Sequence, residues 1–219
     1  AEISANHNGS YDSAKDLIRL AKLNGADAVK LQTYRADTIT LDSNTEDFRI
    51  EEGPWSGQTL YQLYDKAHTP WEWHEPLFEY AKEIGIEIFS SPFDESAVDL
   101  LEKLKAPFYK IASFEAVDIP LIECVASTKK PVIMSTGMAN KDEIGEAVDV
   151  LRRFGSGDIV LLHCISAYPA PSDEYNLLTI EDLSSAFDTP VGLSDHTVDS
   201  IAAISAVALG ACVVEKHFT

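Results

Sequence analysis

Two histidines end apolar stretches near the carboxyl end of the sequence. His196 follows VGLSD and His217 follows VVEK, while Glu2 stands in an apolar run at the amino end. Two imidazoles and a carboxylate suit a divalent transition metal with open coordination positions. A lone histidine is usually a packed or surface side chain, but this pair predicts a metal site. Asp195, beside His196, is either an orienting partner of that imidazole or a cap of the following helix.

Two lysines lie within apolar runs, Lys30 in VKLQT and Lys110 in YKIAS. A single lysine in such a run would extend its ammonium to solvent. Together with nearby hydroxyls and the Gly137 turn, the pair predicts a cradle for a phosphate and a carboxylate, because lysine supplies charge while hydroxyls and backbone N–H groups supply directed donors. The hydroxyls of this cradle are those of Ser91, Ser113 and Ser135. A lysine that forms a Schiff base with a carbonyl substrate is the alternative, and it would not need the histidine pair.

The elements that carry these residues are predicted as alternating strands and helices, the pattern of βα units in a parallel sheet. The strands are predicted at Ala1–Ala5, Ala28–Gln32, Glu87–Ser90, Phe108–Ala112, Val132–Ser135, Ile159–His163, Val191–Leu193 and Cys212–Lys216. The helices are predicted at Tyr11–Asn24, Trp71–Ile84, Ser96–Leu104, Pro120–Ser127, Lys141–Phe154, Thr179–Phe187 and Ser200–Leu209. Eight strands indicate one α/β domain over residues 1–219, a closed (β/α)8 TIM barrel, with an open doubly wound sheet as the alternative. Polar residues follow all eight strands, at the end of a barrel where catalytic residues gather.

The connection between the second and third predicted strands, residues 33–70, is unusually long. A connection of this length in a compact domain is usually a functional lid or disordered. The aromatic residues in and near it are Tyr34, Trp55, Trp71 and Trp73. We expect them either to contact a substrate or to pack within the lid.

The composition excludes some classes of partner. Among 219 residues, 17 basic and 36 acidic side chains give a net charge of −19. Nucleic acids and anionic membranes attract a positive surface, so neither is an expected partner, whereas an anionic small substrate remains possible. Cys124, Cys164 and Cys212 lie in apolar stretches and predict buried thiols in a reducing compartment. With no signal peptide and no apolar run of about 20 residues, we expect a cytoplasmic protein.

Eight ordered segments carry a resemblance to a known family. They are AEISANHNGS, ADAVKLQT, FSSPFD, YKIASFE, IMSTGM, LLHCISAYPAP, VGLSDHT and EKHFT. In this order they resemble the sialic acid synthase family over essentially the whole chain. Within that family, the EISANHNG opening and the HTPWEWH segment are most similar to the pseudaminic acid synthases.

The resemblance implies a fold and an activity. The fold is a TIM barrel that binds phosphoenolpyruvate, an open-chain amino-sugar aldehyde and Mn²⁺, with Mg²⁺ or Co²⁺ as alternatives. The reaction is a condensation that releases phosphate by C–O cleavage, with 2,4-diacetamido-2,4,6-trideoxy-L-altrose as the expected sugar. The alternatives are N-acetylneuraminate or legionaminate synthesis with the same chemistry, and a non-catalytic binding barrel. The family also has a C-terminal antifreeze-like domain and forms a homodimer, so we expect this chain to be a fragment that lacks that domain.

The resemblance also implies roles for particular residues. Metal ligation falls on His196 and His217. The contacts of phosphoenolpyruvate fall on Lys30, Gln32, Ser91, Lys110, Ser113, Ser135 and Ser194. Glu2 and Glu115 match acidic residues near the reacting centre, and which of them is the acid/base stays open. Tyr168 matches a sugar contact, and Ser166 stands where N-acetylneuraminate synthases have asparagine, so the sugar contacts should differ there.

Overall fold

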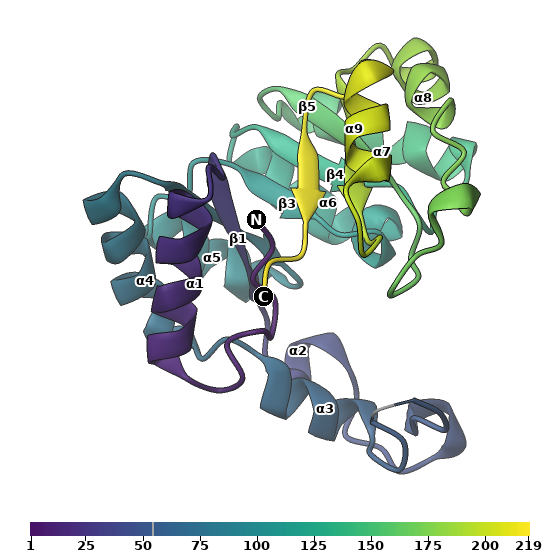
Figure 1. Ribbon diagram of the computed structural model, residues 1–219. Helices are drawn as coiled ribbons and strands as arrows, with labels where there is room; N and C mark the ends of the chain where they lie inside the picture. Colours follow the sequence, from purple (N-terminus) through teal and green to yellow (C-terminus); the bar gives the residue numbers. More distant parts are fainter. Residues whose placement is uncertain (54) are drawn as a thin grey trace. The chain divides into compact units, whose positions relative to one another are not determined.

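The computed structural model describes residues 1–53 and 55–219, so Pro54, in the long predicted connection, lies outside the described residues. The chain forms two compact units (Figure 1). Residues 1–2 and 105–217 form the five-strand unit, and residues 3–104 and 218–219 form the two-strand unit. Within the described residues, no helix is long and apolar enough to cross a membrane.

The two-strand unit contains the parallel pair β1 (Ala28–Thr33) and β2 (Glu87–Pro92). Its helices are α1 (Tyr11–Leu23), α2 (Ala36–Ile39), η1 (Glu46–Phe48), α3 (Leu60–Ala67), α4 (Trp71–Ile84) and α5 (Glu95–Lys103). Helix α1 packs against α4 and β1, and both α4 and α5 pack against β2. The predicted long connection therefore has structure of its own, because it contains α2, η1 and α3, of which α2 and α3 pack together (Figure 1).

The five-strand unit contains β3 (Tyr109–Ile111), β4 (Val132–Ser135), β5 (Ile159–Cys164), β6 (Val191–Asp195) and β7 (Val214–Lys216). Its helices are η2 (Phe114–Val117), α6 (Ile119–Ser127), α7 (Lys141–Phe154), η3 (Ser172–Glu174), α8 (Thr179–Phe187) and α9 (Ile201–Ala208). Each strand pairs in parallel with the next strand along the chain. An open doubly wound sheet reverses its strand order, so this uninterrupted order is that of a βα barrel.

The sheet of the five-strand unit curls. Lys110 on β3 and Glu215 on β7 belong to the two outer strands of the unit, with three strands between them in the sheet order. Their Nζ and Oε1 atoms nevertheless lie 3.8 Å apart. Neighbouring strands are about 4.8 Å apart, so a flat sheet would separate these two by roughly 19 Å. The inner face of the curled sheet therefore brings side chains of β3 and β7 together.

The predicted first strand, Ala1–Ala5, is wrong. In the five-strand unit, Glu2 forms a single parallel bridge with His217, and its N–H donates to the Lys216 carbonyl over 2.8 Å. A turn begins at Ser4, whose φ of 48° is in the left-handed region, and Asn8 has a φ of 49°. Strand residues require extended backbone, so the described residues contain seven strands where the sequence predicts eight.

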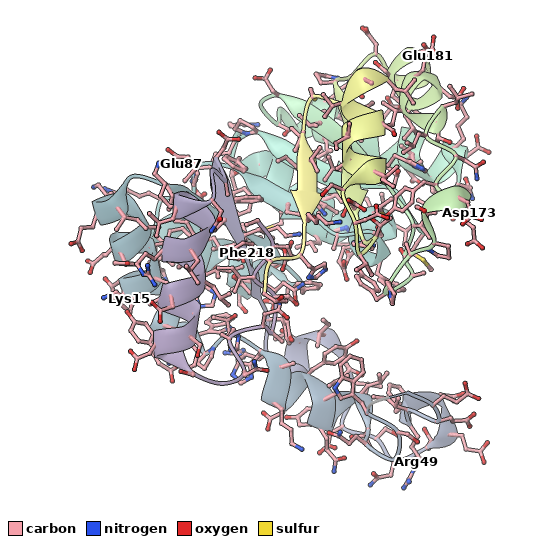
Figure 2. All side chains as sticks on the ribbon, in the orientation of Figure 1. Lys15, Arg49, Glu87, Asp173, Glu181 and Phe218 are labelled. Atoms are coloured by element: carbon pink, nitrogen blue, oxygen red, sulfur yellow. The ribbon has the colours of Figure 1, made fainter. Side chains whose placement is uncertain are left out.

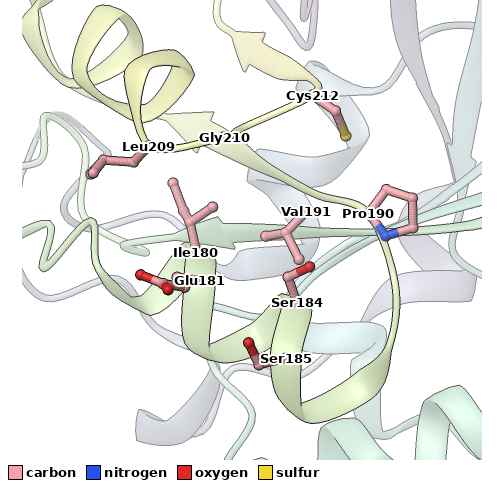
Figure 3. A pocket seen from close by; sticks show the side chains of 9 residues that line it. All are labelled: Ile180, Glu181, Ser184, Ser185, Pro190, Val191, Leu209, Gly210 and Cys212. Carbon is pink, nitrogen blue, oxygen red and sulfur yellow. The ribbon is translucent and has the colours of Figure 1, made fainter.

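The surface of the five-strand unit corrects the cysteine prediction. Cys164 is buried, but Cys124 is half-buried and Cys212 is exposed. Cys212 lines a hollow of about 330 Å³ beside Pro190 and Val191, at the amino end of β6 and far from the strand ends where chemistry is expected (Figure 3). The acidic side chains labelled on this unit in Figure 2, Asp173 and Glu181, are exposed and project outward.

Candidate active site

Lys110 lies at the centre of the polar inner face of the five-strand unit. Its side chain is 2% exposed, so it does not extend its ammonium to solvent. Its Nζ donates to Ser135 Oγ on β4 over 2.7 Å and to the Ile111 carbonyl over 3.3 Å. Glu215 faces the ammonium across 3.8 Å. A buried charge is tolerated when it is paired and hydrogen-bonded, and Lys110 meets both conditions.

Glu215 lies between the lysine and the histidine pair, and the sequence patterns predicted no role for it. Its Oε1 accepts from Ser194 Oγ over 3.1 Å, and the same hydroxyl lies 3.3 Å from His196 Nε2. The sequence contained a usable signal. Glu215 stands two residues before His217, and alternate residues of a strand point to the same face of a sheet.

His196 and His217 come together at the carboxyl ends of β6 and β7, as predicted. Their ring centroids lie 5.7 Å apart, and Tyr168 stacks on His196 at 4.2 Å and meets His217 edge-on at 5.6 Å. His196 Nδ1 lies 2.6 Å from the Ile165 carbonyl. A carbonyl only accepts, so Nδ1 carries the hydrogen and Nε2 is the acceptor nitrogen that a metal requires.

The histidine pair fits a divalent metal. Two imidazoles on one ion, with metal–nitrogen bonds of about 2.1 Å, can have their rings at this separation. Within the described part of the chain, no group of three or more His, Cys, Asp and Glu side chains converges on one point, so Glu2 does not complete a three-residue ligand set. Two protein ligands leave several coordination positions for substrate or water, as the predicted Lewis-acid site needs.

Ser113, Gly137 and Ser166 form a tight cluster around Cys164. Ser113 Oγ accepts from the Gly137 N–H over 3.2 Å and lies 3.1 Å from Cys164 Sγ. A Cβ at Gly137 would come within 2.5 Å of Cys164 Sγ and 2.9 Å of Ser166 Oγ, so only glycine fits. The Gly137 N–H, predicted as a phosphate donor, is therefore used within the protein by Ser113.

The two acidic candidates differ in their surroundings. Glu2 is 2% exposed. Glu115, on η2, is half-buried, and its Oε2 has no hydrogen-bond partner among the described residues. Burial raises the pKa of the Glu115 carboxyl, although Lys110 acts in the opposite direction. A carboxyl with a raised pKa and an unpartnered oxygen is suited to proton transfer.

The remaining predicted contacts, Lys30, Gln32 and Ser91, lie in the two-strand unit. Lys30 is 5% exposed and Ser91 is 1% exposed. Gln32 and Ser91 are paired positions at the carboxyl ends of β1 and β2. Ser91 Oγ is buried and has no hydrogen-bond partner among the described residues, which leaves it available to a ligand.

The aromatic residues predicted as lid or sugar contacts divide into two groups. Tyr34 is 4% exposed and packs edge-on against Tyr64 and Phe93, at 5.8 and 5.4 Å. Trp73 packs edge-on against the buried His7 at 5.5 Å. These two aromatic side chains are part of the packing of the two-strand unit, whereas Trp55 is 51% exposed.

Asp195 does not orient His196. Its Oδ1 accepts from the backbone N–H and the hydroxyl of Thr197, over 2.9 and 2.8 Å. Its Oδ2 accepts from Lys216 Nζ over 2.6 Å, and the carboxylate is fully buried. Asp195 does not cap the following helix either, because α9 begins at Ile201 behind Ser200. It instead stabilises the turn after β6 and joins that turn to β7.

These features define a class of protein: a βα barrel with a buried lysine on the inner face of its sheet and a histidine pair at the carboxyl ends of two neighbouring strands. The comparison with known families agrees. The chain belongs to the NeuB family, whose model matches residues 17–219.

Relatives with assigned activities support the family. The chain is 49% identical over 218 residues to the pseudaminic acid synthase of Helicobacter pylori, spanning all of this chain and 64% of that protein. It is 40% identical to the N,N'-diacetyllegionaminic acid synthase of Campylobacter jejuni, over all of this chain and 66% of that protein. The chain thus spans less than two thirds of the length of these relatives.

Solved structures agree with the fold. The N-acetylneuraminic acid synthetase of Leptospira borgpetersenii, determined with citrate, matches all of this chain and 72% of its own with a TM-score of 0.87 at 32% identity. A truncated 3-deoxy-D-arabino-heptulosonate 7-phosphate synthase from Thermotoga maritima matches 99% of this chain and 72% of its own with a TM-score of 0.67 at 14% identity, a likeness of fold alone.

Proposed function

We propose that this chain is the catalytic barrel of a nonulosonic acid synthase, which condenses phosphoenolpyruvate with an N-acetylated amino-sugar aldehyde and releases phosphate. The observation that carries the proposal is the buried Lys110, linked through Glu215 and Ser194 to His196. Such a site places a positive charge for an anionic substrate next to ligands for a Lewis acid. The names of the relatives, synthases of pseudaminic and legionaminic acids, support the same reaction.

Lys110 is the group we assign to the negative charge of phosphoenolpyruvate. In a chain with a net charge of −19, a small anion is attracted only where a cation dominates locally. Ser135, 2.7 Å from the ammonium, would hold that cation in place and offer a hydroxyl to the same anion. Lys30, Gln32 and Ser91 remain predicted contacts of this substrate.

His196 and His217 are the residues that would hold the divalent cation. When bound, the cation supplies Lewis-acid polarisation of the aldehyde oxygen. The hydrogen bond from His196 Nδ1 to the Ile165 carbonyl fixes the imidazole in the tautomer that ligation needs. Tyr168, whose ring lies 4.2 Å from that of His196, covers one face of the imidazole and remains a predicted contact of the sugar.

The condensation itself needs one carbon–carbon bond and one proton acceptor. C3 of phosphoenolpyruvate attacks the aldehyde carbon, whose oxygen takes up a proton to become a hydroxyl. Water then adds at C2, and the proton that it loses balances the one taken up by the aldehyde oxygen. The adduct collapses to the 2-keto acid as the C–O bond to phosphate breaks, and the proton of its C2 hydroxyl leaves with the phosphate. We assign the proton lost by the water to Glu115, because its raised pKa keeps a carboxylate of higher basicity near Lys110.

Pseudaminic acid is the proposed product. The observation that favours it is the 49% identity to a pseudaminic acid synthase, against 40% to a legionaminic acid synthase and 33% to the human N-acetylneuraminate-9-phosphate synthase. Legionaminic acid synthesis by the same chemistry is the second candidate.

Phosphate release by the full-length protein with Mn²⁺ tests the proposal. We expect release with 2,4-diacetamido-2,4,6-trideoxy-L-altrose and none with N-acetylmannosamine. Release with N-acetylmannosamine alone would assign the protein to N-acetylneuraminate synthesis instead. Absence of release with these two sugars and with the legionaminic precursor would refute the synthase proposal.

A His217→Ala variant tests the metal assignment, with His68→Gln, at the carboxyl end of α3 in the two-strand unit, as the control histidine. We expect the first to lose Mn²⁺-dependent release and the second to retain it. Unchanged release by His217→Ala in metal-depleted buffer would refute the assignment.

A further inference from the structure

The loop that follows β5 holds three of the four polar groups of His196. The imidazole Nδ1 donates to the Ile165 carbonyl over 2.6 Å, and the His196 carbonyl accepts from the Ala170 N–H over 2.9 Å. The third of these groups, the backbone N–H of His196, donates to the phenol oxygen of Tyr175 over 2.7 Å. Four residues of one loop, counting the stacked Tyr168, therefore fix one predicted metal ligand.

Tyr175 bridges two backbone groups through its hydroxyl. Its hydroxyl accepts from the His196 N–H and donates to the Ser194 carbonyl over 3.3 Å, so it joins the two backbone groups on either side of Asp195. A phenol can accept and donate at once, at the end of a rigid ring, whereas a phenylalanine can do neither. The side chain is 1% exposed, so bulk water does not reach this bridge.

The rest of Tyr175 is anchored separately from its hydroxyl. Its carbonyl oxygen accepts from His163 Nε2, and its ring meets the His163 imidazole edge-on at 6.2 Å. Removing the hydroxyl would leave these anchors in place. The backbone of His196 would then lose its link to the loop while the packing of the ring persists.

We infer that Tyr175 is a positioning residue for the metal site: its hydroxyl sets the backbone from which His196 projects, and so sets the affinity for a divalent cation. The inference rests on the proposed function, in which His196 and His217 bind that cation. Removing a hydrogen-bond partner that orients a metal ligand typically weakens metal binding 10- to 100-fold, because the ligand must then be ordered during binding.

The test is Mn²⁺ binding to the full-length protein, measured from the electron paramagnetic resonance signal of free Mn²⁺ without substrate. The variants are Tyr175→Phe and, as the matched control, Tyr109→Phe, which removes the hydroxyl of another fully buried tyrosine of the same unit. We expect an increase in Kd of about tenfold for Tyr175→Phe and less than about twofold for Tyr109→Phe. Thermal unfolding midpoints of the two variants should be similar, and saturating Mn²⁺ should restore most of the phosphate release by Tyr175→Phe.

The outcomes separate this inference from the proposed function. If Tyr175→Phe binds Mn²⁺ as tightly as the parent protein, Tyr175 only fills space and the inference is refuted, while the synthase proposal stands. An equal loss of affinity in both variants, tracking a loss of stability, would refute it as well. If the parent protein itself binds no Mn²⁺, both the metal assignment and this inference fail.

Discussion

Acid should destabilise the two-strand unit through His74, a fully buried histidine on α4. Its Nδ1 lies 3.2 Å from the Pro70 carbonyl and its Nε2 lies 2.9 Å from Thr33 Oγ1. The carbonyl can only accept, so Nδ1 carries the hydrogen of the neutral ring, and Nε2 accepts from Thr33, which accepts in turn from Ser90 over 2.6 Å. A protonated ring would have to reverse this chain of donors inside the protein.

Burial is the main cause that lowers the pKa of His74, from 6.5 to about 4. The hydrogen bond to Pro70 and the charge of Glu72 oppose the shift but do not cancel it. Between these two pKa values the unfolded chain binds a proton that the folded chain does not, so the free energy of unfolding decreases as the pH falls. Well above pH 6.5 the titration of His74 does not reduce the free energy of unfolding. It reduces that free energy by about 2 kcal/mol at pH 5 and by about 3 kcal/mol at pH 4.

Urea unfolding of the parent protein and of His74→Gln, at pH 7.5 and 5.0, measures this contribution. Other titrating groups are common to both proteins, so the parent should lose about 2 kcal/mol more than the variant between the two pH values. Thr33→Ser, which keeps the hydroxyl that faces Nε2, should show the same pH dependence as the parent. An equal pH dependence in the parent and His74→Gln, or an NMR titration of His74 with a midpoint near 6.5, would refute the reasoning.

Four further substitutions have defined expectations. Lys216→Met should decrease the free energy of unfolding by about 2–4 kcal/mol, because it leaves the Asp195 carboxylate buried without its cation. The double variant that also carries Asp195→Asn should recover part of this loss, as measured by urea unfolding. Glu115→Gln should decrease the rate of phosphate release at least about 100-fold. In the parent protein the rate should decline as the pH falls through the raised pKa of that carboxyl, and in the variant this decline should be absent. A variant whose rate still declines at acidic pH as the parent's does would contradict the assignment. Gly192→Ala should cost about 2–3 kcal/mol, because its Cβ would lie 2.3 Å from a backbone carbonyl oxygen of the neighbouring chain segment. By contrast, Gly145→Ala, inside α7 and 3.5 Å from the nearest atom, should stabilise the protein by about 0.5–1 kcal/mol, and equal thermal shifts in the two would contradict both expectations.

Most elements of the fold were predictable, because their signals are local. Continuous apolar runs identified seven strands to within two residues at each end, and capping residues such as Asn140 marked helix starts. The failure at Ala1–Ala5 also has a local cause, since Asn8 and Gly9 favour a turn and the apolar run was extended too close to it. The helix α3 was missed although Thr59 and Gln62 form a capping box, a pattern visible in the sequence.

The site was predictable in its members more than in its contacts. Residue type and position at strand ends identified Lys110, Ser135 and both histidines. Asp195 plays neither of its two predicted roles, because its buried carboxylate pairs with Lys216, 21 residues away, which no local pattern indicates. The contribution of Tyr175 could not be predicted, because it comes from a loop whose path no local pattern specifies.

Strand register explains why the histidines meet even though the sequence separates them by 21 positions. β6 pairs with β7 so that Asp195 faces Lys216, and the next residue along each strand is a predicted metal ligand. A shift of one residue in this register would turn one imidazole to the opposite face, because side chains alternate along a strand. Gly192 allows the close approach of the two segments at which this register is set, and the ion pair between Asp195 and Lys216 fixes it at the other end. The geometry of the predicted metal site therefore depends on Gly192, Asp195 and Lys216 as well as on the two histidines, although none of these three is a predicted ligand.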